Sequence, residues 1–363
     1  MKEKNDLKIC FVNISYRTNE LARLQRRWHQ ILTRISKRGH KVAYVSLSPL
    51  SGIENPYVGY GLGSCLSLGK VLATGSDIFL ANLLEPGVLA YLSKKLQGKK
   101  FVFDYTDHYE ILARYEGYRL RTHYVSPLQN VIPKLADRVI VVRDEFRKQC
   151  LTHGVPESKI TVIPDGVDTR KFTPDIEGDE VRERFGIAED PLVVYVGKVE
   201  EYYNLDVVVK AASIVIEFEP SMKFLFVGPG RSMTRLKNLA KRLELSDSVI
   251  FAGYQPYGRI PDFMGAADVA VFPHPQGLAV CEYMACGKPI VKPKEETGDM
   301  LEHLKSGFLI EDRTPQSFAG GIIEMLRNRK LAARLGYNAR SLAVEKYDWE
   351  FLADRYVRVL QSA

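Results

Sequence analysis

Short apolar runs alternate along the chain with longer segments in which apolar residues recur at helical spacing. The first run spans Leu7–Val12, and the apolar residues of 21–38 then fall on one helical face, which predicts a buried strand followed by a helix. Strands separated in this way by helices are typical of parallel sheets covered by helices on both faces. Further strands are predicted at 41–45, 78–80, 101–103, 139–142, 161–163, 192–196, 224–227, 249–251, 269–272, 290–291 and 308–310.

The alternation of strands and helices restarts after Asp165-Gly166, which indicates two domains of the same class. A chain of 363 residues is also longer than one hydrophobic core usually organises. We therefore predict an α/β protein with two Rossmann-like doubly wound domains, at 1–166 and 167–346, and a C-terminal helix at about 347–363. Because ligands of such sheets bind beyond the carboxyl ends of the strands, the cleft between two facing domains is the expected site.

The net charge of +7 is unevenly distributed along the chain. Up to Asp165 there are 25 Lys and Arg residues against 15 Asp and Glu, about +10, whereas the remainder has 26 against 29, about −3. Two interpretations are open: the basic half docks on an anionic membrane surface, or its charges form an ordinary solvated face. Part of the surplus lies opposite the apolar face of the helix predicted at 21–38, at Arg23, Arg26, Arg27, Arg34, Lys37 and Arg38.

The beginning of the chain is polar and carries both charge signs, so no secretory leader is expected. The most apolar long stretch, 71–92, contains Asp77, Glu85 and Pro86, which a bilayer core disfavours. The five cysteines are scattered and lack metal-ligand spacing. We expect a reduced, cytoplasmic protein without a metal site, whose contact with a membrane would be peripheral and on its inner face.

One segment, Val269–Val291, carries more chemical information than any other. Its pattern predicts a strand, a loop, a short helix, a glycine turn and a second strand. Gly277 and Leu278 fall at the start of this helix, where unpaired backbone N–H groups favour a phosphate. Glu282 lies about one turn further on, where a carboxylate can accept two hydrogen bonds from a vicinal diol such as ribose. An isolated glutamate would be interpreted as a surface residue, but in this segment the binding role is favoured.

The segment resembles the donor-site motif of the GT-B-fold retaining glycosyltransferases of family four, also called glycosyl transferases group 1, and their relatives. Further segments match that family in order: 136–142 resembles its AD-x-VI strand, 159–172 its hinge, and 226–253 its paired glycine turns. Tyr347-Asp348-Trp349 resembles the start of the family's last helix, which crosses back to the first domain. The resemblance covers the whole chain and is weakest in the N-terminal part.

The resemblance implies a metal-independent hexosyltransferase that moves a sugar from a nucleotide-diphosphate sugar to a saccharide or lipid-linked acceptor with retention of configuration. It implies no cofactor, because the nucleotide sugar is a substrate, and no nucleic-acid partner. A fixed cation and helix N-termini would stabilise the departing diphosphate. Carried over by position, the donor-binding residues are Gly197, Tyr203, Gly230, Arg231, Tyr254, Gly277, Leu278 and Glu282, and Lys198 and His274 are the catalytic candidates.

Two positions depart from the family pattern. His274 stands where the family has the first of its two glutamates, and it supplies no fixed negative charge beside an oxocarbenium-like centre. Tyr203 stands where the family has a lysine, and a phenol is neutral at pH 7. Lys198 also lacks the bidentate fork of the family's arginine. A catalytically weakened nucleotide-sugar-binding partner subunit therefore stays open as an alternative, whereas a sugar-nucleotide epimerase or a phosphorylase fits the motif less well.

The N-terminal half offers one catalytic cluster, in the loop after the strand predicted at 101–103. Related enzymes carry an Asp or His in this loop near the transferred sugar, so Asp107 or His108 could orient the acceptor hydroxyl. The competing interpretation is that Asp104 and Asp107 cap the next helix.

Overall fold

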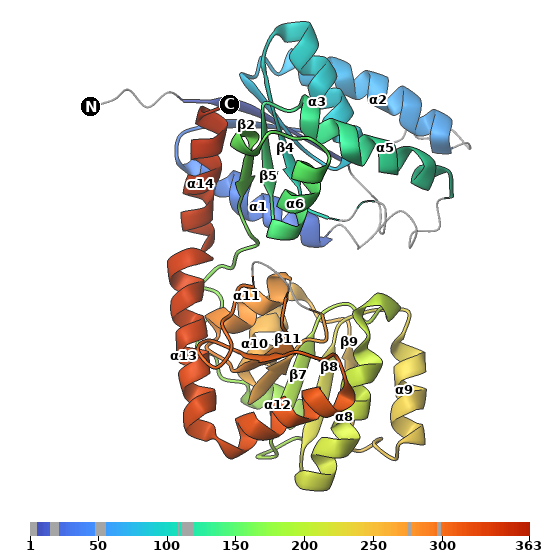
Figure 1. The fold of residues 1–363 in the computed structure, drawn as a ribbon, viewed down its shortest axis with the longest axis vertical. Helices are drawn as coiled ribbons and strands as arrows, with labels where there is room; N and C mark the ends of the chain where they lie inside the picture. Colours follow the sequence, from blue (N-terminus) through green and yellow to red (C-terminus); the bar gives the residue numbers. More distant parts are fainter. Residues whose placement is uncertain are drawn as a thin grey trace. The chain divides into compact units, whose positions relative to one another are not determined.

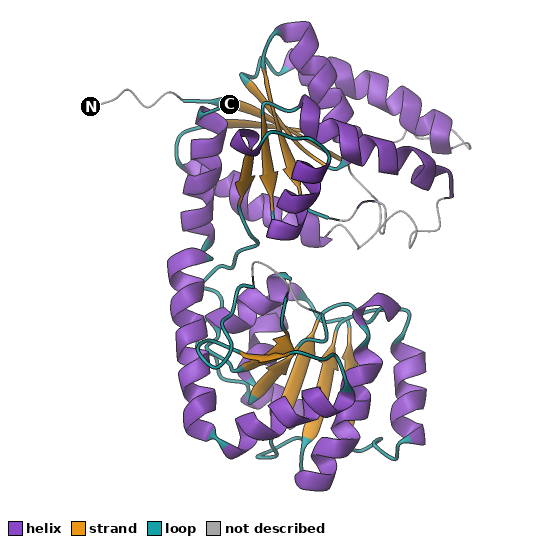
Figure 2. Ribbon diagram, in the orientation of Figure 1, coloured by secondary structure: helices purple, strands orange, loops and turns teal. Residues whose placement is uncertain are grey.

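The computed structural model of the chain describes residues 6–14, 22–47, 56–107, 109, 119–274, 277–295 and 299–363. The chain divides into two compact units, Met1–Pro164 with Trp349–Ala363, and Asp165–Asp348. Each unit contains a parallel sheet flanked by helices (Figure 1), with helices on both faces of the strands (Figure 2). The predicted fold class is therefore confirmed, and every apolar run predicted as a strand overlaps one, with ends that differ by one or a few residues.

In the described part of the first unit, the strands form a six-stranded parallel sheet in the order β2-β1-β3-β4-β5-β6. Residues paired across this sheet include Asn82 of β3 and Asp104 of β4, so their side chains point to the same face. The strands are β1 Lys8–Ile14, β2 Lys41–Leu47, β3 Ile78–Asn82, β4 Lys100–Tyr105, β5 Arg138–Val141 and β6 Ile160–Val162. The helices are α1 Ala22–Lys37, α2 Pro56–Ala73, α3 Leu84–Gln97, α5 Arg119–Leu135, α6 Asp144–Thr152, η2 Glu157–Lys159 and α14 Trp349–Gln361.

Alternate residues of the buried strands supply two separate apolar faces in this unit. Cys10 and Val12 of β1 belong to a core cluster that also includes residues of α2, α3, α5 and α6. Phe11 points the other way and packs against Trp28 of α1, with ring centroids 4.4 Å apart. Trp28 in turn contacts Tyr356 of α14, so α1 and α14 share the second face. The apolar face predicted for the first helix is confirmed by the burial of Trp28, Ile31 and Ile35.

The second face also contains a buried ion pair. The Arg27 guanidinium lies 3.8 Å from Oδ2 of Asp104, and Tyr356 Oη donates to the same oxygen at 2.9 Å. Arg27 further donates to the carbonyl oxygens of Ile163 and Pro164 at 3.1 and 3.0 Å. Burial raises the pKa of Tyr356, which keeps its hydroxyl a donor at neutral pH. The interpretation of Asp104 as a helix cap is therefore wrong, because it belongs to β4 and its carboxylate faces α1 and α14.

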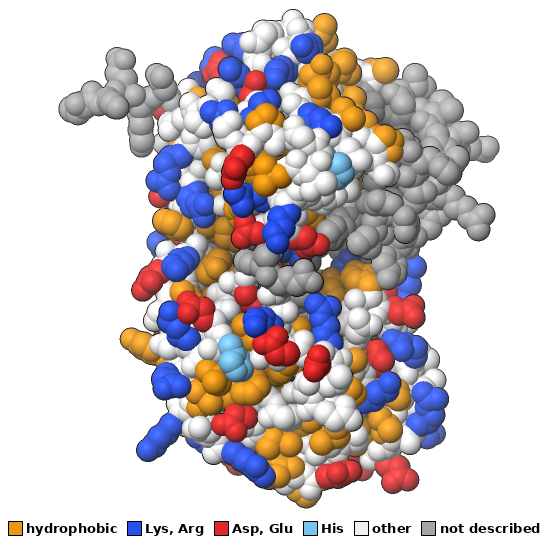
Figure 3. Space-filling model, viewed as in Figure 1, with side chains coloured by type: hydrophobic (Ala, Val, Ile, Leu, Met, Phe, Trp, Pro, Cys, Tyr) orange, Lys and Arg blue, Asp and Glu red, His pale blue; other side chains and the backbone are white. Residues whose placement is uncertain are grey.

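Several basic side chains of the first helix form contacts within the first unit. Arg34 and Arg38 form ion pairs with Glu350 of α14 at 2.9 and 3.2 Å, and Arg38 pairs with Asp354 at 2.6 Å. With Arg27 buried as well, the prediction of a solvated face is wrong for these three arginines, because α14 packs along α1 and places Glu350 and Asp354 beside two of them. On the side of the molecule shown in Figure 3, basic and acidic side chains are intermixed. No helix in the described ranges is both long enough and apolar enough to cross a membrane.

In the described part of the second unit, six parallel strands follow the order β12-β11-β10-β7-β8-β9, and apolar residues on both faces of this sheet form its core. The strands are β7 Leu192–Val196, β8 Lys223–Val227, β9 Val249–Gly253, β10 Val269–Val271, β11 Ile290–Pro293 and β12 Phe308–Ile310. The helices are α7 Asp179–Arg184, η3 Glu201–Tyr203, α8 Leu205–Phe218, α9 Met233–Arg242, η4 Tyr257–Arg259, α10 Ile260–Gly265, α11 Leu278–Ala285, α12 Pro315–Arg327 and α13 Arg329–Lys346.

We expect Arg27→Met to lower the free energy of unfolding of the first unit by about 3–5 kcal/mol, because it leaves the Asp104 carboxylate buried without its cation. Both tryptophans of the chain, Trp28 and Trp349, lie in this unit, so tryptophan fluorescence in a denaturant titration follows it selectively. Lys37→Met on the exposed side of the same helix is the control, with an expected change within about 0.5 kcal/mol. Equal effects of the two substitutions would contradict a stabilising role of the Arg27 network.

Candidate functional site

The carboxyl edge of the second sheet brings together residues that are far apart in the sequence. Gly197 and Lys198 follow the last residue of β7, and Gly230 with Arg231 lies in the loop after β8. Tyr254 follows β9, and His274 lies in the loop after β10. Since β10, β7, β8 and β9 are neighbours in that order, these predicted residues share one edge of the sheet.

The loops after β7 and β8 approach each other so closely that two positions require glycine. A Cβ atom at Gly228 would lie 1.8 Å from the carbonyl oxygen of Gly197, and one at Gly230 would lie 2.0 Å from that of Val199. Gly228 also has a φ of +138°, which side-chain-bearing residues rarely adopt. The tight backbone contact fixes Lys198 and Arg231 relative to each other on this edge.

Lys198 is also held through its own carbonyl group. The Tyr195 hydroxyl donates to the Lys198 carbonyl oxygen at 2.8 Å, and burial raises the pKa of Tyr195, so this donor keeps its proton at neutral pH. The backbone N–H of Arg231 donates to Oε1 of Glu200 at 3.2 Å. The segment after β7 and the loop after β8 therefore form one hydrogen-bonded frame, which holds the backbone of Lys198.

The two residues that depart from the family pattern contact each other. The centroids of the Tyr203 and His274 rings lie 4.3 Å apart, at an interplanar angle of 42°. The ring of Tyr202 also packs against that of Tyr203, with a centroid distance of 4.3 Å. Tyr203 ends the short helix η3 after β7, whereas His274 follows β10. An aromatic pair therefore occupies the positions of a lysine and a glutamate in the family pattern.

Helix α11 carries the predicted nucleotide-binding glutamate. Gly277 is its N-cap residue and Leu278 its first residue, so the predicted helix start is confirmed. Glu282 lies in the middle of the helix and is only 5% exposed. Its Oε1 accepts a hydrogen bond of 2.7 Å from the hydroxyl of Tyr257, which lies in η4. A carboxylate this deeply buried and directly hydrogen-bonded is not the freely solvated side chain of an ordinary surface helix.

Tyr254, in contrast, is 66% exposed, directly after the left-handed turn at Gly253. An exposed aromatic ring at the carboxyl edge is available to stack on a flat ligand group. Tyr257, three positions later, was not found by the sequence reasoning. Its contact with Glu282 joins residues 25 positions apart, and no sequence motif predicts a contact at that spacing.

In the first unit, Asp107 lies in the loop directly after β4 and is half-buried. His108 lies outside the described residues. Neighbouring Tyr109 has its pKa raised mainly by burial, with a further contribution from the negative charges of Asp104 and Asp107. The predicted acceptor-orienting role of Asp107 and His108 stays a prediction. Within the described ranges, no three His, Cys, Asp or Glu side chains come together as a metal site.

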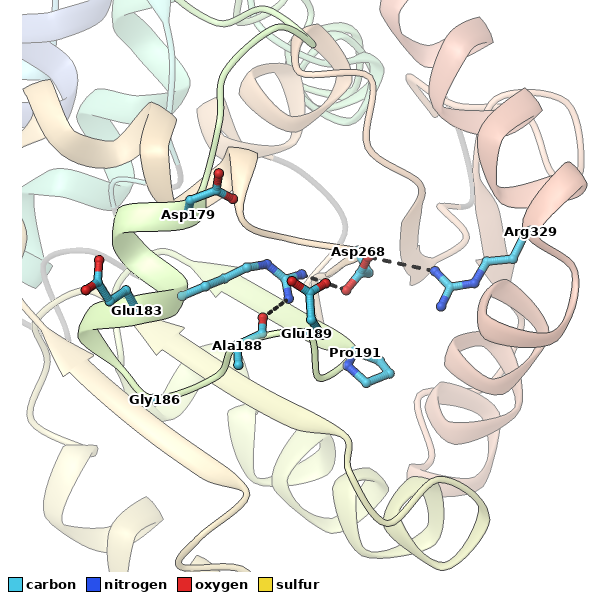
Figure 4. Close-up of a pocket in the computed structure, with 9 residues that line it drawn as sticks. Asp179, Glu183, Gly186, Ala188, Glu189, Pro191, Asp268 and Arg329 are labelled. Atoms are coloured by element: carbon cyan, nitrogen blue, oxygen red, sulfur yellow. Dashed lines mark hydrogen bonds and ion pairs between the residues drawn. The ribbon is translucent and has the colours of Figure 1, made fainter.

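A pocket of about 590 Å³ lies at the opposite end of the second sheet, next to Pro191 and Asp268, which immediately precede β7 and β10 (Figure 4). Its Arg182 donates to the carbonyl oxygens of Ala188, Asp190 and Ala266 and pairs with Asp268 at 2.8 Å. The remaining charges are mostly carboxylates, which disfavour a diphosphate. This pocket is therefore a poor candidate for a nucleotide site, despite its volume. Its acidic lining residues are Asp179, Glu183, Glu189 and Asp268.

Two family models together match most of the chain. The model described as Glycosyltransferase Family 4 matches residues 24–171, and that described as Glycosyl transferases group 1 matches residues 178–342. An uncharacterized glycosyltransferase of Methanocaldococcus jannaschii is 23% identical over 292 residues, which are 78% of this chain and 73% of that protein. A D-inositol 3-phosphate glycosyltransferase of Acidothermus cellulolyticus is 31% identical over 245 residues, 63% of this chain and 54% of that protein.

The same fold occurs in solved structures. The Anabaena protein HepE, crystallised in complex with UDP, aligns with a TM-score of 0.76 and 20% sequence identity, over 98% of this chain and all of that one. A sucrose-phosphate synthase of Thermosynechococcus elongatus aligns with a TM-score of 0.75 and 17% identity, over 98% of each chain. The expected two-domain GT-B fold is thereby confirmed.

We expect Glu282→Ala to weaken binding of a nucleoside diphosphate by about 10- to 100-fold, since a hydrogen bond to a charged group contributes about 1.5–3 kcal/mol. Calorimetric titration with UDP and with GDP measures the affinity, and the melting temperature checks the fold. Glu345→Ala, an exposed carboxylate on α13 of the same unit, is the matched control and should leave the affinity unchanged. Unchanged affinity in Glu282→Ala would remove this residue from the site.

Proposed function

Because the chain belongs to the glycosyltransferases described by the group 1 and family 4 models, we propose that it transfers a hexosyl group from a nucleoside-diphosphate sugar to an acceptor, with retention of configuration. The acceptor class we propose is a saccharide or a lipid-linked saccharide. The observation that carries the proposal is the gathering of Lys198, the Gly228–Arg231 loop and buried Glu282 at the carboxyl edge of one sheet. That edge supplies a cation, backbone N–H groups and a diol-binding carboxylate, which are the groups a nucleotide sugar requires.

In the proposed reaction, the bond between the anomeric carbon and the diphosphate oxygen breaks, and its electron pair leaves with the phosphate. The acceptor hydroxyl oxygen attacks from the same face, and its proton passes to the departing phosphate oxygen. Lys198 and the N-terminus of α11 at Leu278 stabilise the charge of this leaving group. The proposed step requires no metal, because Lys198 and the N-terminus of α11 stabilise the negative charge of the leaving diphosphate. Asp107 and His108 are proposed to orient the acceptor hydroxyl.

The Tyr203–His274 pair supports a second candidate, a nucleotide-sugar-binding partner subunit with little activity of its own. Neither ring carries the fixed charge that the family's glutamate places beside the transferred sugar or that its lysine supplies to the phosphate. The phenol and the imidazole can still exchange hydrogen bonds with sugar hydroxyls or phosphate oxygens, so binding is retained under either candidate. The two candidates differ in turnover and not in affinity.

A transfer assay with purified protein distinguishes them. UDP-sugars are tested first and GDP-sugars second, each selected by the rise in melting temperature on binding. We expect turnover that EDTA does not reduce and a product with the anomeric configuration of the donor. Lys198→Ala should reduce kcat by about 100-fold or more and affect donor affinity far less, because the leaving-group charge is greatest in the transition state.

Lys210→Ala, at an exposed position of helix α8, is the charge control for this assay and should leave kcat unchanged. Donor binding without turnover of any acceptor or water would favour the partner subunit. Equal losses of affinity and turnover in Lys198→Ala would mean that Lys198 only binds the donor.

We also propose that the first unit associates peripherally with anionic membranes, which suits a lipid-linked acceptor. Three arginines of α1 are already paired or buried within the unit, so the surface we favour lies on α2 and α3 (Figure 3). Leu66 is 57% and Leu96 66% exposed, and Lys70 and Lys95 lie on the exposed sides of the same helices. Exposed apolar side chains next to lysines match the apolar boundary and negative surface of such a bilayer.

We expect co-sedimentation with phosphatidylglycerol vesicles at low salt and its loss at high salt, because each lysine near the surface contributes only about 1 kcal/mol and is screened by salt. The double variant Lys95→Ser, Leu96→Ser should sediment less. Lys346→Ser, an exposed position on α13 of the second unit, is the control and should sediment like the wild type. Absence of binding at low salt, or equal binding to neutral vesicles, would contradict the proposal and favour a soluble saccharide acceptor.

A further inference from the structure

Tyr257 contacts the carboxylate of Glu282 although it lies in a different element. It begins the short helix η4 after β9, and its hydroxyl donates to Oε1 of Glu282 at 2.7 Å. The tyrosine is half-buried and the glutamate is buried. A phenol that donates to an ionised carboxylate makes a charge-assisted hydrogen bond, which is stronger and more directional than a neutral one. The contact therefore selects one orientation of the carboxylate.

The tyrosine ring is itself held by the segment that opens the second unit. The Lys171 ammonium lies 3.8 Å from the centroid of the Tyr257 ring, within the range of a cation–π contact, and also donates to the Tyr257 carbonyl oxygen at 3.3 Å. The ring of Phe172 lies 5.9 Å from that of Tyr257. One lysine thus contacts the tyrosine through both its ring and its backbone.

The lysine-bearing segment is fastened to the helix that carries Glu282. Arg340 of α13 donates to the carbonyl oxygens of Thr169 and Phe172, at 3.1 and 2.9 Å. The same guanidinium nitrogen donates at 2.9 Å to the carbonyl oxygen of Ala285, the last residue of α11. Arg340 therefore links the backbone segment of Lys171 to the helix of Glu282, and Tyr257 contacts both of these side chains.

We propose that Tyr257 is a positioning residue for nucleotide binding, which holds the Glu282 carboxylate ready to accept hydrogen bonds from the two vicinal hydroxyls of a ribose. The inference rests on the proposed function, in which Glu282 binds the donor ribose. A carboxylate has about four lone-pair sites on its two oxygens, so the bond from Tyr257 is compatible with further bonds from a diol. Fixing the side chain before the ligand arrives removes the ordering cost from the binding step.

This arrangement makes ribose recognition the property that Tyr257 controls. Loss of the hydroxyl removes one hydrogen bond that orients the Glu282 carboxylate, and the ribose hydroxyls then gain less from it. The base and the diphosphate are bound by other groups of the carboxyl edge, so their contribution stays the same. Tyr257 therefore determines the preference for a ribonucleotide over one without the two hydroxyls.

The test compares dissociation constants of UDP and 2′,3′-dideoxy-UDP, or of the guanosine pair if GDP is the nucleotide bound. The wild type should prefer the ribonucleotide by about tenfold or more. Tyr257→Phe keeps the ring and should lower this ratio about three- to tenfold, with the affinity for the dideoxy nucleotide unchanged. Lys171→Gln should lower the ratio in the same direction and by less.

Tyr337→Phe, on the exposed side of α13, is the matched control and should leave the ratio unchanged. Equal weakening of both nucleotides in Tyr257→Phe, together with a lower melting temperature, would show a merely structural role and overturn the inference. An unchanged ratio would overturn it as well. If the wild type bound neither UDP nor GDP, the proposed function would fail, and this inference with it; binding by the wild type with no effect of Tyr257→Phe would overturn the inference alone.

Discussion

Parallel strand pairing in the second unit is the constraint on which the candidate site depends. It places the carboxyl ends of β7 to β11 on one edge, so that loops far apart in the sequence contact one another there, as Tyr203 and His274 do. The pairing is tight enough that the loops after β7 and β8 meet backbone to backbone at Gly197 and Gly228. Lys198 and Glu282 are thereby held by a fixed backbone frame, which the proposed binding of a diphosphate and its departure would require.

The two departures from the family pattern are one structural feature. Tyr203 and His274 come from different loops, yet their rings are in contact. A lysine and a glutamate at these positions would form a pair of opposite charges. Two aromatic rings interact there by dispersion and stacking, without an ion pair. In the proposed reaction, this substitution leaves less fixed charge at the site, so more of the electrostatic stabilisation would fall on Lys198 and the start of α11.

Three arginines of the basic first half of the chain are used in contacts within the first unit. Arg27 is neutralised by Asp104 and bonded to the carbonyl groups of Ile163 and Pro164, while Arg34 and Arg38 meet the carboxylates of α14. These arginines attach the C-terminal helix and the end of the first unit's chain to its sheet. The charge of these three arginines, which looks available for an external partner in the sequence, is therefore used inside the unit, and the membrane contact proposed above relies on lysines of other helices.

The sequence by itself determined the order and type of the elements, because apolar periodicity is a local property that each strand and helix carries in its own residues. It also placed Gly277, Leu278 and Glu282 at the start and middle of one helix, since their spacing is fixed along a single element. Only the tertiary structure decided which side chains meet across elements. The Arg27–Asp104, Tyr203–His274 and Tyr257–Glu282 contacts join residues that no local period relates, and they exist because strand order and helix packing bring distant segments together.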